Sequence, residues 1–217
     1  MGGGVFLRIC RICKRRLCRF DSGGSRRVLF CSRRCVGQRS GGIDANSHLH
    51  AALRTLLPSN RTIEEVVTTA SSTFCQSALP AQFATLVLGK ADRSGNVELV
   101  KASHNSVLLV EGAEVEVIAA ASLPFGMFCS TDFTGARRSV SPESTLFLYS
   151  DGITESTDEA GNEFDLNRLA ETLLQSRNRL PSELVETIQR TILGFTNGAQ
   201  PGDDRTMLAL RWSPKGI

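Results

Sequence analysis

The order in which helical and strand-like patterns follow one another limits the fold of this chain most. From residue 47 onward, two helical patterns come first and strand-like runs follow between residues 83 and 149. Two more helices lie between residues 166 and 193, and a last strand covers residues 207–212. An alternating order would predict a parallel sheet. The segregated order favours an α+β layered fold with antiparallel sheets flanked by helices.

Local signals predict where several of these elements begin and end. Apolar residues at helical spacing stop at Pro58, and Asn60 or Thr62 opens the second helix, with Glu64 and Glu65 in its first turn. Turn residues separate the strand-like runs, so we expect an antiparallel meander made of residues 83–88, 97–100, 106–110 and 115–118.

The composition suits one globular domain with a sizeable core. The chain has 217 residues, of which 41% are hydrophobic and 22% charged. No stretch approaches the roughly 20 apolar residues of a membrane span, and the basic start lacks the apolar core of a signal peptide. We therefore expect a cytoplasmic protein without membrane contact, in which Cys75 and Cys129 are unpaired thiols.

The first 46 residues differ in composition from the rest. They hold eleven lysines and arginines against two acidic residues, and five of the seven cysteines. Cys10-x-x-Cys13 and Cys31-x-x-x-Cys35 are spaced like ligands of a zinc site. We divide the chain into this basic segment, residues 1–46, and a domain at residues 47–217.

Two short acidic loops carry the chemistry of the second part. Ser150-Asp151-Gly152 directly follows an apolar run, and Gly202-Asp203-Asp204-Arg205-Thr206 directly precedes another. A carboxylate at a strand tip that faces a second such carboxylate forms the outline of a site for a hard cation, and Gly152 permits a close approach of backbone or metal.

These loops resemble those of PPM-type metal-dependent serine/threonine protein phosphatases, in the SpoIIE-like bacterial branch. The resemblance covers about residues 47–212, and the two acidic loops with their spacing are its specific part. The weaker matches are Phe83-Ala84-Thr85, Lys101-Ala102-Ser103-His104-Asn105, Leu123-Pro124-Phe125-Gly126 and Gly161-Asn162-Glu163-Phe164. We assign no catalytic role to His104, because a lone histidine in a hairpin more often packs or hydrogen-bonds.

The resemblance implies a layered α-β-β-α sandwich and hydrolysis of phosphoserine or phosphothreonine by a water held between two Mn²⁺ or Mg²⁺ ions. It assigns Asp151 and Asp203 as metal ligands, Asp204 as a less secure ligand, and Gly152 and Gly202 as backbone support. The implied substrate is a phosphorylated regulatory protein of the anti-sigma-factor antagonist type.

The family takes its other carboxylates from two N-terminal runs, Gly-Asp-Tyr-x-Asp and Gly-Asp-Val-Ser-x-Lys-Gly. Neither run exists in residues 1–46. We therefore expect a sandwich that is incomplete on its N-terminal side, and little or no activity of the chain as written.

The genetic code suggests an explanation for the missing runs. Codons that encode residues 14–20, read one base later, permit Ser-Gly-Asp-Tyr-(Val/Ala)-Asp. The same offset over residues 33–45 permits Gly-Asp-Val-Ser-(Gly/Ala)-Lys-Gly-Val-Ala-Ala-Ser-Met-Leu. Both runs reappear in order and lead into the helix that follows. We hypothesise that residues 1–46 are an out-of-frame reading, or otherwise a disordered segment.

Two functional classes remain open at this point. The first is an enzyme of the phosphatase family with a reduced metal site. The second is a non-enzymatic protein, in which Cys10, Cys13, Cys31 and Cys35 bind zinc beside a degenerate phosphatase scaffold. Nucleic acid is not an expected partner, since a shifted frame produces arginine without selection for it.

Overall fold

The computed structural model describes residues 6–12, 17–21, 27–36, 45–57, 61–77, 82–103, 107–118, 123–199 and 203–213, and before residue 47 it describes the backbone alone.

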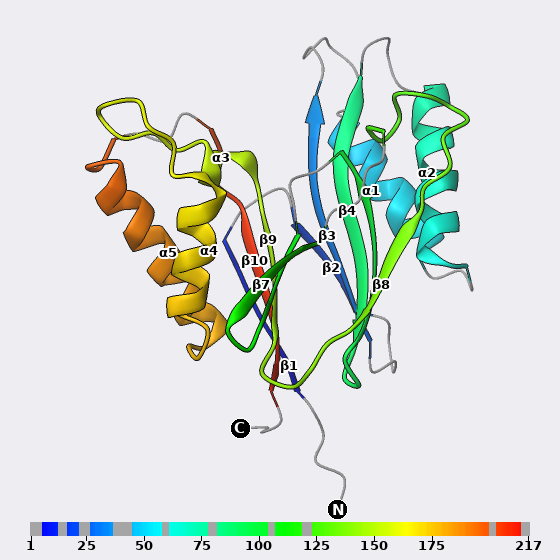
Figure 1. Cartoon of the computed structure of the whole chain (residues 1–217). Coiled ribbons are helices and arrows are strands. Elements are labelled where there is room, and N and C mark those ends of the chain that lie inside the picture. Colours follow the sequence, from blue (N-terminus) through cyan, green and yellow to red (C-terminus); the bar gives the residue numbers. More distant parts are fainter. Residues whose placement is uncertain are drawn as a thin grey trace, which may run out of the picture.

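Two antiparallel sheets pack face to face, and helices cover their outer faces (Figure 1). Sheet A has the strand order β1 (Phe6–Ile12), β10 (Met207–Ser213), β9 (Thr145–Tyr149), β6 (Val107–Glu111), β7 (Glu114–Ile118). Sheet B has the order β2 (Leu17–Asp21), β3 (Arg27–Val36), β4 (Phe83–Asp92), β5 (Asn96–Ala102), β8 (Gly135–Ser139). The helices are α1 (Ala45–Leu56) and α2 (Ile63–Ser77) on sheet B, α4 (Asp165–Gln175) and α5 (Pro181–Phe195) on sheet A, and the short α3 (Asp151–Thr154) after β9. The α+β class and the α-β-β-α layering are confirmed.

Apolar side chains fill three layers between these elements. In β5, Leu99 joins the cluster between the two sheets, whereas Val100 and Ala102 join the cluster under α1 and α2. In β10, Leu208 faces the space between the sheets and Met207 faces α4 and α5. Because successive side chains of a strand point to opposite faces, each inner strand contributes to two layers of the core.

The predicted start of the second helix is confirmed as a capping box. The amide of Thr62 donates to Glu65 Oε2 at 2.8 Å, and the amide of Glu65 donates to Thr62 Oγ1 at 3.2 Å. These two bonds satisfy amides that the first turn of a helix leaves without an intrahelical partner. Thr62, rather than Asn60, is therefore the residue that opens α2.

The predicted meander is wrong. β4 pairs with β5 in sheet B, but β6 pairs with β7 and β9 in sheet A, so the chain crosses from one sheet to the other between residues 102 and 107. Strand periodicity reports which face of a strand is apolar and does not report the partner strand. The sequence patterns also missed β8, whose residues include Arg137 and Arg138 and whose side chains are largely exposed.

The basic N-terminal segment contributes three strands to the sheets. β1 pairs with β10 at one edge of sheet A, and β3 pairs with β4 in sheet B. The expectations of a wholly disordered segment and of sheets that lack these strands are therefore wrong for residues 6–12, 17–21 and 27–36. Ladder hydrogen bonds join main-chain groups, so strands can pair here without the two acidic runs. The strands do not test the out-of-frame hypothesis, which stays a prediction.

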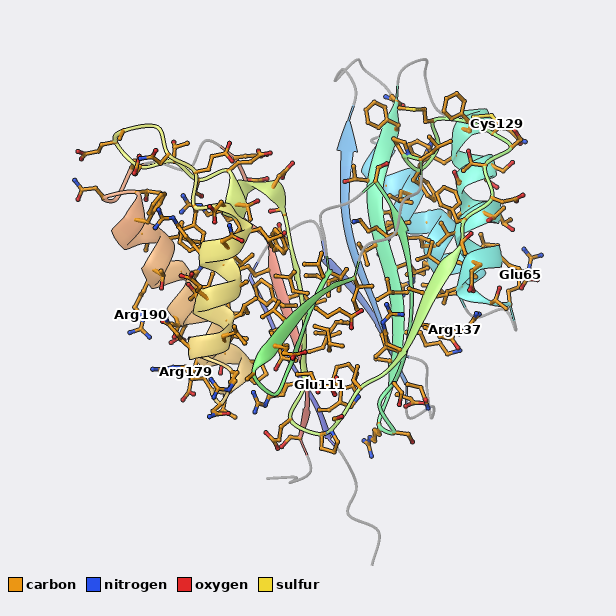
Figure 2. All side chains as sticks on the ribbon, in the orientation of Figure 1. Glu65, Glu111, Cys129, Arg137, Arg179 and Arg190 are labelled. Carbon is orange, nitrogen blue, oxygen red and sulfur yellow. A yellow bond between two sulfur atoms is a disulfide. The ribbon has the colours of Figure 1, made fainter. Side chains whose placement is uncertain are left out.

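The prediction for Cys75 and Cys129 is also wrong, because the two residues form a disulfide. Cys75 belongs to α2, and Cys129 lies in the connection between β7 and β8, near one end of that helix (Figure 2). The two cysteines are 54 residues apart, so their spacing gave no sign of a pair. The bond ties α2 to a loop that also packs Phe125 against Phe74.

Within the described part of the chain, no helix has the length and apolar character needed to cross a membrane.

Candidate metal and phosphate site

Strands β9 and β10 bring the two acidic loops to the same end of sheet A. The strands are antiparallel neighbours, and Tyr149, the last residue of β9, lies opposite Met207, the first residue of β10. Asp151 therefore follows one strand where Asp203 precedes the other. Residues 150–152 and 203–206 form this feature, which we call the acidic corner, and α3 marks its position in Figure 1.

Ser150 fastens the two loops of the acidic corner together. Its hydroxyl donates to the carbonyl oxygen of Asp204 at 2.9 Å and accepts a hydrogen bond from the amide of Thr206 at 2.9 Å. Its own amide donates to the carbonyl oxygen of Thr206 at 3.0 Å. Three hydrogen bonds thus continue the pairing of β9 and β10 past their ends and fix the loops relative to each other.

Gly152 allows the two loops to touch. A Cβ atom on this residue would lie 2.8 Å from the carbonyl oxygen of Asp204 and 3.2 Å from that of Asp203. The first separation is shorter than real Cβ contacts and the second is tight, so a larger side chain would push the loops apart. The assignment of Gly152 to backbone support of a metal site stays a prediction.

Arg205 adds a second tie on the other side of Gly152. Its Nε donates to Ser156 Oγ at 3.1 Å and to the carbonyl oxygen of Gly152 at 3.3 Å, while the Ser156 hydroxyl donates to the same carbonyl at 2.7 Å. Burial lowers the pKa of the Arg205 guanidinium from its ordinary value. The Arg205 side chain therefore holds the α3 turn against the loop before β10.

The three predicted aspartates differ in their setting. Asp151 and Asp203 are half-buried and Asp204 is exposed. One carboxylate oxygen of Asp151 accepts from the amide of Gly152 at 3.1 Å, and Asp203 Oδ1 accepts from the amide of Asp204 at 2.7 Å. The roles of Asp151, Asp203 and Asp204 as metal ligands stay predictions. Gly202 and His104 lie outside the described residues.

The carboxylates of the acidic corner fit a hard divalent cation in type but not in number. Mg²⁺ and Mn²⁺ take oxygen ligands, and Mg²⁺ requires about six of them, with water filling positions that the protein leaves open. The described residues contain no group of three or more acidic, histidine or cysteine side chains arranged around one point. The acidic corner therefore supplies part of a site and does not complete a two-metal centre by itself.

The cysteines of the zinc alternative lie far apart on the backbone. Cys31 and Cys35 are both in β3, where four residues of extended chain separate their Cα atoms by about 13 Å. Zinc binds thiolates at about 2.3 Å, so this strand does not offer both cysteines to one ion. Cys10 belongs to β1 in the other sheet, and Cys13 lies outside the described residues.

Four residues of the site escaped sequence reasoning. The acidic loops are held by Ser150, Ser156, Arg205 and Thr206. None of these residues is a carboxylate, so the two-metal pattern does not point to them. Their only signal in the sequence is adjacency to the Asp-Gly and Asp-Asp pairs. Hydrogen bonds between residues more than 45 positions apart, as between Ser150 and Asp204 or between Arg205 and Ser156, become visible only in the folded chain.

A pocket of about 440 Å³ lies in sheet B, around the turn between β4 and β5 and away from the acidic corner. It is lined by basic and acidic side chains whose charges are already matched. The ion pairs are Lys90–Glu98 at 3.7 Å, Arg137–Glu64 at 2.9 Å and Arg138–Glu116 at 2.9 Å. This pocket does not belong to the acidic corner.

Known proteins of similar sequence and structure match most of the chain. Protein IcfG from Synechocystis sp. is 30% identical over 132 residues, which make up 60% of this chain and 21% of that protein. The PP2C phosphatase domain of SpoIIE from Bacillus subtilis, solved with a fragment of its regulatory domain, has a TM-score of 0.80 at 16% identity and covers 97% of this chain and 64% of that one. The RsbU and RsbW domains of a Mycobacterium tuberculosis protein give a TM-score of 0.78 at 20% identity, over 99% of this chain and 61% of that one.

The chain thus spans about a fifth of the curated relative and less than two thirds of these two solved chains. The structures establish the fold, and the family model for stage II sporulation protein E matches residues 45–213. That match contains all of the acidic corner, the β4–β5 and β6–β7 hairpins and the four longer helices. On this evidence the chain belongs to the SpoIIE family and contains a SpoIIE-like domain of the PPM phosphatase type.

Proposed function

We propose that this chain derives from a phosphatase that hydrolyses phosphoserine or phosphothreonine on a regulatory protein. We further propose that the chain as written hydrolyses such substrates slowly or not at all. The observation that carries the proposal is the acidic corner. Its two loops are fixed to each other by Ser150 and Arg205, so Asp151 and Asp203 are held as a preformed pair of strand-tip carboxylates. Preorganised carboxylates of this kind serve metal-assisted phosphoryl chemistry.

The expectation of low activity rests on the opposite half of the site. A two-metal centre needs carboxylates on both sides of the ions, and residues 1–46 contain only Asp21 and Asp44 as acidic residues. The bound ions would supply an activated water and offset charge on the phosphoryl oxygens. This chain would contribute one of the two sets of metal ligands, which consists of Asp151, Asp203 and, more weakly, Asp204.

The positions of the hypothetical alternative reading support the out-of-frame hypothesis. Position 34, where that reading has an aspartate, lies in β3 opposite Thr85, near the start of β4. The start of β4 pairs with the end of β5, from which the chain crosses to β6 and the strand tips of sheet A. An aspartate at position 34 would therefore lie at the same end of the sandwich as the acidic corner.

The substrate and the cellular location belong to the same proposal. A phosphorylated anti-sigma-factor antagonist is the partner that the family suggests, and the cytoplasm is the location such a partner would require.

The test is hydrolysis of p-nitrophenyl phosphate and of a phosphoserine peptide with Mn²⁺ by the purified chain, beside Asp151→Asn, Asp203→Asn and Glu186→Gln. Glu186 is an exposed carboxylate on α5 and serves as the matched control. We expect turnover near background in all four proteins, and Mn²⁺ binding that weakens in Asp151→Asn and Asp203→Asn only. Mn²⁺-dependent turnover that Asp151→Asn abolishes would overturn the expectation of low activity. Stoichiometric zinc lost on mutating Cys10 or Cys31 would favour the non-enzymatic alternative.

A further inference from the structure

A disulfide ties an exposed loop segment to the end of helix α2. Cys75 lies two residues before the end of α2 and is half-buried, whereas Cys129 lies in the connection between β7 and β8 and is exposed (Figure 2). A thiol from solution can therefore approach the bond from the Cys129 side. Exposed disulfides exchange with such thiols more readily than buried structural ones do.

The connection is fixed before Cys129 by hydrogen bonds that do not depend on the disulfide. Phe125 and Ala84 exchange two hydrogen bonds between amide and carbonyl, each 2.8 Å long. The amide of Gly126 donates to the buried Ser71 hydroxyl at 2.9 Å. Since none of these contacts involves a cysteine, we expect this part of the connection to stay in place when the disulfide opens.

The connection is fixed again after Cys129, at Phe133. The ring of Phe133 is buried in the cluster under α1 and α2, and its amide donates to Thr68 Oγ1 at 3.3 Å. In the part of the chain that the structure describes, no hydrogen bond or ion pair joins residues 128–132 to another element. Four of these five residues are exposed. The disulfide is therefore what holds residues 128–132 against α2.

The fold has enough apolar core to form without this bond. Three clusters of buried side chains fill the layers between the sheets and the helices. Domains that depend on disulfides are mostly small ones that cannot build such a core. We therefore expect the chain with an open bond to remain folded, although it is less stable.

These contacts distinguish what the bond holds from what the core holds. Opening the bond frees residues 128–132 from α2 and leaves both sheets in place. We propose that Cys75 and Cys129 form a reversible redox switch that sets the order of residues 128–132, with thiols and disulfides of the surroundings as its co-reactants.

The switch goes beyond the proposed function, because it needs neither metal nor turnover. Only the surroundings in which it works come from that function, through the proposed cytoplasmic location. Disulfides that form in a reducing cytosol are mostly transient, catalytic or redox-sensing.

The exchange balances in two steps. A thiolate of the reductant attacks Cys129 Sγ and forms a mixed disulfide with it, while Cys75 leaves as a thiolate and takes up a proton. A second thiol of the reductant loses its proton and attacks the reductant sulfur of the mixed disulfide, so that Cys129 leaves and is protonated. Two electrons and two protons have then passed to the chain, and the reductant has become a disulfide. Oxidation runs the same steps in reverse.

The experiment equilibrates the full chain in mixtures of reduced and oxidised glutathione, starting from the oxidised and from the reduced protein. Free thiols are then blocked, and mass spectrometry of the peptides distinguishes Cys75 and Cys129 from the five N-terminal cysteines. A brief digestion with chymotrypsin compares cleavage after the exposed Phe128 with cleavage after Phe147, which is buried in β9. Cys129→Ser fixes the open state, and Cys18→Ser is the matched control that removes a cysteine outside the pair.

We expect the bond to go from mostly closed to mostly open across the mixtures, with the same end point from both directions. Opening should speed cleavage after Phe128 at least about tenfold, because proteases cut mobile, exposed segments. Cleavage after Phe147 requires unfolding of the core and should stay at least about tenfold slower than cleavage after Phe128. Cys129→Ser should be cut at the faster rate in every mixture, and Cys18→Ser should follow the parent chain.

Three results would overturn the proposal. A bond that stays closed in every mixture is a permanent structural link. Unchanged cleavage after Phe128 on opening would mean that the bond does not order residues 128–132. Equal rates after Phe128 and Phe147 in the open protein would mean that the bond holds the whole fold. Turnover of a phosphopeptide enters none of these outcomes, so the switch and the proposed function fail independently.

Discussion

The acidic corner and the N-terminal segment lie in the same sandwich and differ in what they contribute to it. The acidic corner combines backbone pairing with side chains suited to metal and phosphate chemistry. The N-terminal segment, residues 1–46, supplies strands to both sheets, yet it is rich in arginine and cysteine and holds only two acidic residues. Main-chain hydrogen bonds and an apolar core are enough for a fold, whereas a reaction needs particular side chains at particular positions.

Replacing residues 14–19 and 33–45 by the sequences of the alternative reading frame is the strongest test of this difference. Residues 14–19 would become Ser-Gly-Asp-Tyr-Val-Asp, and residues 33–45 would become Gly-Asp-Val-Ser-Gly-Lys-Gly-Val-Ala-Ala-Ser-Met-Leu. We expect Mn²⁺-dependent hydrolysis of p-nitrophenyl phosphate to rise at least about a hundredfold, because the second set of carboxylates completes the metal site. Initial rates measure the change. Adding Asp151→Asn to the restored protein must remove the gain, and a restored protein as slow as the parent would refute the idea that only the N-terminal half is missing.

Reducing the disulfide separates the stability of the framework from the chemistry of the acidic corner. Cys75 and Cys129 close a loop of 54 residues, and opening such a loop typically costs about 2–4 kcal/mol of unfolding free energy. We expect Cys75→Ser to lower the urea midpoint accordingly, while Mn²⁺ binding at low denaturant stays unchanged. Cys129→Ser should have the same effect as Cys75→Ser, and the double variant should add little. Different effects of the two single variants would contradict a cross-link as the cause.

Gly152→Ala should disturb the acidic corner alone. The new methyl group would approach the carbonyl oxygens of Asp204 and Asp203 to 2.8 Å and 3.2 Å, and relieving that overlap costs about 1–3 kcal/mol. We expect lower stability and weaker Mn²⁺ binding, measured by urea unfolding and by metal titration. Gly194→Ala is the control, since no atom lies within 4 Å of a Cβ at that helical position. That control should be neutral or slightly stabilising. Equal behaviour of the two variants would show that the loops do not press together at Gly152.

Replacing Glu111 should have the smallest effect on stability of the changes considered. Unlike the aspartates of the acidic corner, this carboxylate supports the fold and not the proposed metal site. It lies at the far end of β6 from that corner (Figure 2), where it accepts hydrogen bonds from the Ser141 amide at 2.9 Å and the Ser144 hydroxyl at 3.1 Å. These bonds, with Ser141 foremost, lower the pKa of Glu111 below the ordinary glutamate value of 4.5. The carboxylate therefore stabilises the fold above pH 4.5 and loses that contribution as the pH falls through its folded pKa.

Glu111→Gln should accordingly lower the unfolding free energy by at most about 1 kcal/mol at neutral pH, since solvent screens the site. The difference from the parent chain should shrink under acid, which urea unfolding at several pH values would show. Mn²⁺ binding should stay unchanged. A difference that persists at pH 3 would mean that the carboxylate charge is not the cause.

Much of the layered fold could be predicted because its signals are local. The apolar spacing in α2 and α5, the capping residues at Thr62 and Glu65, and the apolar run of β9 each follow from neighbours in the chain. The assignment of β6 to a meander failed, and the pairing of Cys75 with Cys129 was missed, because both depend on which distant segments meet. Strand partners and cross-links are decided by the packing of the whole chain.

The sequence by itself indicated the family, the four longer helices and most strands from residue 83 onward, and it gave the prediction of Asp151 and Asp203 as ligands, since these follow from residue types at fixed local spacing. Only the tertiary structure decided how the site is held and what else it offers. Ser150, Arg205 and Thr206 gain their roles from partners some 50 residues away. The physical reason is burial: a polar group is costly only where the fold removes it from water, and no local pattern records where that happens.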